Sequence, residues 1–173
     1  MKQNFFNRFM LLRWLLPAAL SLLLLGLQAC SKDKMCEDEP FCARVNGKVW
    51  VPVSDSDFKT SELTFHLIDD THQFWVRAKR SSAVILFGVI NANSNIQIGD
   101  YILNESNNNG YYSPEPGKEL LTDSTYTGLL SITAIDRVKK TIAGTFYFRA
   151  RNPATGEVVD VSHGRFDAIY SEY

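Results

Sequence analysis

Residues 141–150 read TIAGTFYFRA, and the alternation in this stretch decides the fold. Ile142, Gly144, Phe146, Phe148 and Ala150 occupy every second position, and Ala143, Thr145, Tyr147 and Arg149 lie between them. A period of two places the first set on one face of a β-strand and the second set on the other. The stretch therefore predicts a strand whose apolar face lies against a core.

The same period extends on both sides of this stretch, from residue 41 to the C-terminus. Short apolar runs alternate with turn residues, and no segment after the N-terminal one predicts a helix of ordinary length. The predicted strands are 41–45, 48–53, 63–68, 73–79, 83–90, 101–103, 126–135, 141–150, 158–162 and 165–170. This pattern predicts an all-β domain, an antiparallel β-sandwich of about eight to ten strands, with a lipocalin-like closed β-barrel as the alternative.

Turn residues indicate how neighbouring strands connect. Asn46-Gly47 is the strongest short hairpin signal, because both residues accept the positive φ of a type I′ turn. The last two predicted strands meet near His163-Gly164. We expect Trp50 and Trp75 to belong to the core.

The N-terminal segment has the organisation of an export signal. Lys2, Arg8 and Arg13 precede an apolar stretch, residues 14–29, which has 16 residues and is shorter than the ~20 that a membrane-spanning helix needs. The stretch ends in Leu-Gln-Ala-Cys at residues 27–30, which is typical of a lipobox. We therefore expect residues 1–29 to be a lipoprotein signal peptide and Cys30 to carry a diacylglyceryl group and an N-linked acyl chain such as palmitate. The alternative is an ordinary secretory cleavage that leaves Cys30 as a free N-terminal thiol.

Two regions follow the signal. Residues 30–40 are polar, charged and without periodicity, which predicts an acylated flexible tether, and residues 41–173 form a single β-rich domain. Cys36 and Cys42 remain once Cys30 is lipidated. An even pair in an exported protein favours a disulfide between them, and two free buried thiols are the alternative.

The charge balance argues against a nucleic-acid partner. Of 18 Lys and Arg residues three lie before Cys30, so 15 remain against 19 Asp and Glu, a formal charge of −4. The remaining cations are scattered, and a nucleic-acid surface needs a basic stripe. Membrane lipid, reached through Cys30, is the expected partner.

The longest irregular stretch runs from residue 104 to 124. Its Asn run, its two Pro residues and its Gly residues predict a loop, and a loop of this length in a compact domain is usually functional or disordered. Tyr111 and Tyr112 at its centre are candidate residues for binding a ligand or partner, because aromatic side chains give a large contact area at low entropic cost. The alternative is that the two rings pack the loop against the domain.

No catalytic, metal or cofactor motif follows the signal. The only His–acid cluster is Asp69, Asp70 and His72, with His66 on the preceding strand, and we interpret it as a polar hairpin turn. Neither a Gly-x-Ser-x-Gly elbow nor a Gly-rich phosphate loop occurs. We expect no cofactor, no metal and no catalytic residue.

Several segments resemble a known group of proteins. They are FCARVNGKVW at residues 41–50, GDY at 99–101, residues 128–136, IAGTFYF at 142–148 and GRF at 164–166. These resemble uncharacterised lipoprotein domains, of unknown function, from Bacteroidota-type bacteria. The resemblance implies a small β-rich exported domain and assigns no activity.

The expected function follows from the anchor and the missing motifs. We expect an outer-membrane lipoprotein that presents a non-enzymatic β-domain to an envelope protein or glycan. By resemblance to Gram-negative sorting, Ser31 after the acylated Cys favours the outer membrane. A carbohydrate or small-ligand binding module is the alternative, and an envelope hydrolase is the third class.

The lipid anchor is testable by substitution. Cys30→Ala removes the sulfur that accepts the diacylglyceryl group, so the variant should incorporate no fatty-acid analogue and should stay uncleaved or be released in soluble form. Metabolic labelling followed by gel fluorescence measures this. Equal label in the wild type and the variant would refute the lipoprotein assignment.

Overall fold

The computed structural model describes residues 36, 38–53, 62–104 and 107–172. The expected signal peptide and Cys30 lie outside the described residues, as does most of the expected tether. The described residues include no helix with the length and hydropathy of a membrane span.

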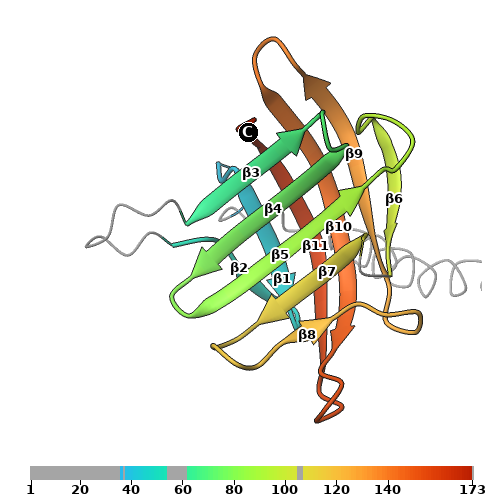
Figure 1. Ribbon diagram of the computed structural model, residues 1–173. Helices are drawn as coiled ribbons and strands as arrows, with labels where there is room; N and C mark the ends of the chain where they lie inside the picture. The colour runs from blue at the N-terminus through green and yellow to red at the C-terminus, as the bar shows by residue number, and fades with distance from the viewer. Residues whose placement is uncertain (1–35, 37, 54–61, 105–106, 173) are drawn as a thin grey trace, which may run out of the picture. The chain divides into compact units, whose positions relative to one another are not determined.

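The domain is built almost entirely of antiparallel strands (Figure 1). They are β1 (Phe41–Val45), β2 (Lys48–Trp50), β3 (Leu63–Ile68), β4 (Gln73–Arg80), β5 (Ala83–Ile90), β6 (Gly99–Leu103), β7 (Asn109–Ser113), β8 (Leu120–Leu121), β9 (Gly128–Asp136), β10 (Thr141–Arg151) and β11 (Val158–Ile169). The predicted all-β class is confirmed.

One curled sheet contains all eleven strands, in the order β2-β1-β11-β10-β8-β7-β5-β4-β3, with β9 paired to β10 and β6 paired to β9. Its two halves face each other as a half-barrel (Figure 1). The curl brings the far strand β3 back to the end of β11, where Ser171 N donates to Phe65 O at 2.9 Å and Leu67 N donates to Ser171 O at 3.2 Å. The fold is therefore a single sheet that curls into a partly closed barrel.

The interior is filled by aromatic rings from both halves of the sheet. Phe87 of β5 lies 4.2 Å from Phe146 of β10 between ring centroids, and Phe41 of β1 lies 5.2 Å from Phe146. Phe74 of β4 lies 5.7 Å from Phe166 of β11. Among the described residues, the buried apolar side chains all lie between Phe41 and Tyr170. We therefore expect the chain from residue 41 onward to fold as one unit.

Glycines opposite the rings make this packing possible. Phe146 of β10 pairs with Gly164 of β11, and Gly144 of β10 pairs with Phe166 of β11. A Cβ atom on Gly164 would lie 2.5 Å from Phe146 Cε1, and one on Gly144 would lie 2.7 Å from Phe166 Cζ. Each ring thus covers the glycine on the neighbouring strand, which is a favourable cross-strand pairing in a curved sheet.

The structure corrects the prediction for residues 104–124. This stretch contains β7 and β8, which join the two halves of the sheet: β7 pairs with β5, and Leu121 of β8 pairs with Arg151 of β10. Leu120 is 1% exposed, so the stretch also contributes to the core. The Asn, Gly and Pro residues of the stretch are typical of a loop, and its two strands are only five and two residues long. The sequence pattern therefore did not reveal them. With these two strands, the described part of the chain has eleven strands, above the expected eight to ten.

The structure also differs from the predictions in the boundaries of the last strands and in the burial of Trp75. The two strands expected at 158–162 and 165–170 form the continuous β11, and His163 has a φ of 51° where the register with β10 shifts. The Asn46-Gly47 turn is confirmed, with φ values of 49° and 78°. Trp50 is buried as expected, but Trp75 is not in the core, because it lies on the outer face over Gly88.

The ring-over-glycine packing predicts the effect of Gly164→Ala. The new methyl group meets the Phe146 ring, so the variant should lose about 1–3 kcal/mol of unfolding free energy, as overpacked cores do. Urea denaturation measures the loss. The loss should shrink in a Phe146→Leu background, and the outward-facing Thr145→Val should stay within about 0.5 kcal/mol of the wild type. A wild-type midpoint for Gly164→Ala would refute the packing argument.

Cys36 and Cys42 are joined by a disulfide, with their Cα atoms 5.6 Å apart. Cys42 lies in β1 and is fully buried. We expect the exported protein to have the same bond. Its intact mass should not change on alkylation until reductant is added. Two alkylated thiols without reductant would refute the pairing.

Candidate ligand-binding cleft

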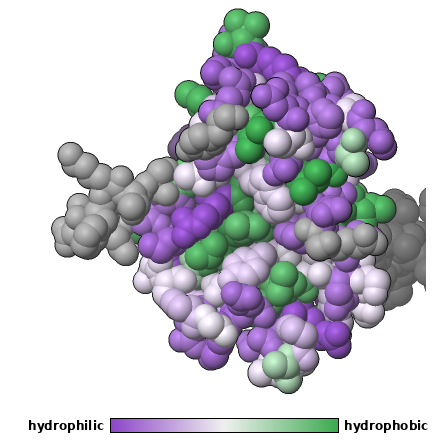
Figure 2. Space-filling view, in the orientation of Figure 1, coloured by the Kyte–Doolittle hydropathy of each residue, from purple (hydrophilic) through white to green (hydrophobic). Residues whose placement is uncertain are grey.

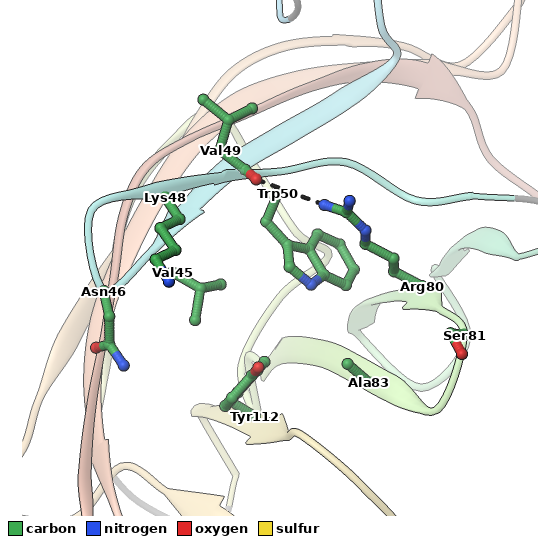
Figure 3. Close-up of a pocket in the computed structure, with 9 residues that line it drawn as sticks. All are labelled: Val45, Asn46, Lys48, Val49, Trp50, Arg80, Ser81, Ala83 and Tyr112. Carbon is green, nitrogen blue, oxygen red and sulfur yellow. Dashed lines mark hydrogen bonds between the residues drawn. The ribbon is translucent and has the colours of Figure 1, made fainter.

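A cleft opens at the end of the half-barrel where the β1–β2 and β4–β5 turns lie. Its volume is about 540 Å³, which falls in the size range of small-molecule sites. Its lining comes from five strands and two turns, namely Val45, Asn46, Lys48, Val49, Trp50, Arg80, Ser81, Ala83 and Tyr112 (Figure 3).

The aromatic core forms the inner wall of the cleft. Trp50 is 6% exposed, and its ring packs edge-on against Phe41 with centroids 5.9 Å apart. Figure 3 shows its indole nitrogen turned toward the side where Tyr112 and Ala83 lie. The cleft is therefore the open end of the same ring cluster that fills the interior.

Hydrogen bonds of the Asn46 backbone and side chain fix one wall of the cleft. The tip of the β1–β2 hairpin is held to β11, because Asn46 N donates to Asp160 O at 2.8 Å and Asn46 Oδ1 accepts from Asp160 N at 3.0 Å. The Asn46-Gly47 turn thereby sets the position of Lys48 and Trp50 on β2. Val49 contributes its carbonyl oxygen, and its side chain points away from the cleft (Figure 3).

The opposite wall is the β4–β5 turn together with β7. Arg80 Nη1 donates to Val49 O at 3.5 Å across the cleft, and Ser82 Oγ donates to Pro114 O at 3.3 Å. Tyr112 of β7 pairs with Ile85 of β5, so its ring lies on the inner face of the sheet. Burial raises the pKa of the Tyr112 hydroxyl, and the charge of Glu157 raises that pKa further. The hydroxyl is therefore protonated in neutral solution and available as a donor.

The two tyrosines that the sequence predicted as one site, Tyr111 and Tyr112, lie on opposite faces of the sheet. Tyr112 faces the cleft, whereas Tyr111 pairs with Leu86 on the outer face. Adjacent residues of a strand point to opposite faces, so the two rings cannot belong to one site once β7 has formed. The structure brings Tyr112 together with Trp50 and separates it from Tyr111.

Sequence reasoning missed three lining residues. Trp50 was expected in the core, and Lys48 and Arg80 were counted only among the scattered cations. The sequence contained a signal for Arg80. It lies two residues after Ala78, at the next position of the inward-facing set Phe74, Val76 and Ala78 in β4. No sequence spacing could show that Lys48 and Arg80, which are 32 residues apart, line one cleft.

Polar contacts occupy the opposite end of the half-barrel. Arg137 donates to both carboxylate oxygens of Asp69, at 3.0 and 3.1 Å, and to Ile96 O at 2.9 Å. Ser171 Oγ lies 3.2 Å from His66 Nδ1. The His–acid cluster of the sequence is thus divided between an ion pair and a contact with the C-terminal segment.

The curled antiparallel sheet with a cleft at one end defines a small all-β, barrel-like domain. The chain belongs to the family described as Domain of unknown function (DUF6252), which matches residues 54–169. This match begins after β2, so it includes Arg80 and Tyr112 but not the β1–β2 wall of the cleft. Neither a curated protein nor a solved structure matches the chain.

Proposed function

We propose that this protein is a cell-envelope lipoprotein of a Bacteroidota-type bacterium, anchored to the outer membrane through Cys30, whose non-enzymatic domain binds a small ligand in the end cleft. The observation that carries the binding role is the cleft itself. It combines an aromatic wall with several polar groups that converge on one space, which is the usual make-up of a small-molecule site.

The anchor rests on the sequence of the N-terminal segment. A diacylglyceryl group and an N-linked acyl chain supply more apolar chain than the two signals that stable membrane attachment needs. A binding domain held in this way samples ligands close to the membrane surface.

A second candidate function is recognition of an envelope protein or glycan by the outer face of β4, β5, β7 and β8. The residues that favour it are Trp75, Leu86, Tyr111 and Leu121, of which Leu121 is 37% exposed. Trp75 Nε1 donates to Gln73 Oε1 at 3.0 Å, which holds the ring over Gly88. Figure 2 shows apolar side chains within this face, surrounded by polar ones. We favour the cleft for a small ligand, because small-molecule sites are concave.

A neutral aromatic probe tests the cleft. The mature chain from residue 30, carrying Cys30→Ala, should bind 2-naphthamide, with amide chemical-shift changes in NMR spectra centred on Trp50, Ala83 and Tyr112. Ala83→Trp fills the space beside Trp50 and should abolish these changes.

The matched control is Val84→Trp, which adds the same side chain at the next residue, on the outer face. It should leave binding at the cleft unchanged, because adjacent strand residues face opposite sides. Shift changes centred on Trp75, Leu86 and Tyr111 in the wild type would instead favour the outer-face function. Binding that survives Ala83→Trp would refute the cleft as the site.

A further inference from the structure

Two cations occupy inward-facing positions at the mouth of the cleft. In β4 the buried residues Phe74, Val76 and Ala78 alternate along the inner face, and Arg80 takes the next inward position. In β2 Lys48 shares the inner face with Trp50. A core pattern would place apolar residues at these positions, so both charges are directed at the space inside the mouth.

No acidic side chain of the described part neutralises these cations. Some other cations of the domain form ion pairs, among them Lys79 with Glu62, Arg137 with Asp69 and Lys140 with Glu172. Among the described residues neither Lys48 nor Arg80 forms an ion pair, and none of the nine lining residues is a carboxylate. The lining therefore has two cations and no carboxylate, while Glu157 lies outside the lining, close enough for its charge to raise the pKa of Tyr112.

The polar groups of the cleft are mainly donors. Asn46 Oδ1 is used by Asp160 N, which leaves the Asn46 amide hydrogens, and Val49 O is used by Arg80. The Trp50 indole N–H and the Tyr112 hydroxyl have no hydrogen-bond partner within the described chain, and both lie at the cleft (Figure 3). An ionised carboxylate accepts hydrogen bonds and donates none, so it complements such a site.

We infer that the cleft binds a small organic carboxylate whose apolar ring lies against Trp50 and Val45 and whose carboxylate lies between Lys48 and Arg80. This inference rests on the proposed function and adds the ligand class. The ring occupies the aromatic wall, and the carboxylate receives hydrogen bonds from the cations at the mouth and from the donors beside it. The fork of Arg80 matches the two carboxylate oxygens.

A matched pair of probes tests the ligand class. The probes 2-naphthoate and 2-naphthamide have the same ring and differ in the charge of the substituent. The mature chain with Cys30→Ala should bind 2-naphthoate on the order of tenfold more tightly at low salt, because two cations at the mouth each make a charge-assisted contact. The difference should narrow as salt is added, since exposed charges are screened.

Substitutions assign this preference to the two cations. The double variant Lys48→Gln/Arg80→Gln should bind 2-naphthoate no better than 2-naphthamide, and the readout is the ratio of the two affinities within the same variant. The charge-retaining Lys48→Arg should keep the preference, as should Lys139→Gln, which removes a cation from the opposite end of the domain. Both side chains of the double variant are exposed, so melting temperatures by circular dichroism should match the wild type.

The outcomes separate the two proposals. If both probes bind in the cleft with equal affinity, or if the double variant keeps the preference for 2-naphthoate, the carboxylate class is wrong and the binding role stands. If neither probe shifts the cleft resonances, both proposals fail. A preference for 2-naphthoate that is lost only in the double variant supports the inference.

Discussion

The packing of phenylalanine rings over glycines between β10 and β11 is the constraint on which the rest of this structure depends. Phe146 covers Gly164, and Phe166 covers Gly144, so two large rings enter the interior from neighbouring strands without colliding. The rings then reach Phe87 and Phe74 on the opposite half of the sheet. An antiparallel sheet of this size exposes an apolar face unless it curls, and these rings provide the surface around which it curls.

The cleft follows from the same ring cluster. The rings fill the interior as far as Trp50, and beyond it the inward positions hold Lys48 and Arg80. Charged side chains cannot lie within an apolar interior without a partner, so the core ends where they begin and the space between them opens to solvent. At the opposite end, the ion pair of Arg137 with Asp69 ties two turns together. One end of the half-barrel is therefore open, because its inward-facing cations form no ion pair within the described chain. At the other end, an ion pair joins two turns.

Prediction from the sequence succeeded where one face of a strand is strongly apolar. The alternation in residues 141–150 identified β10, and Asn46-Gly47 identified the β1–β2 hairpin, because each signal is local. It failed for β7 and β8, whose residues are those of a loop and which are held in the sheet by pairing with β5 and β10. It also placed Trp75 in the core, since an aromatic residue on a strand does not reveal that a glycine of the next strand leaves room for its ring outside.

The sequence by itself determined the all-β class, the hairpin at Asn46-Gly47 and the apolar face of the longest strands, because side-chain alternation and turn chemistry act between neighbouring residues. Only the tertiary structure decided that the sheet curls into a half-barrel, that Tyr111 and Tyr112 lie on opposite faces, and that Lys48, Arg80 and Trp50 line one cleft. Those features depend on contacts between residues far apart in the chain. Their positions are fixed by the register of the paired strands and by ring packing across the interior. Neither can be predicted from any single stretch of sequence.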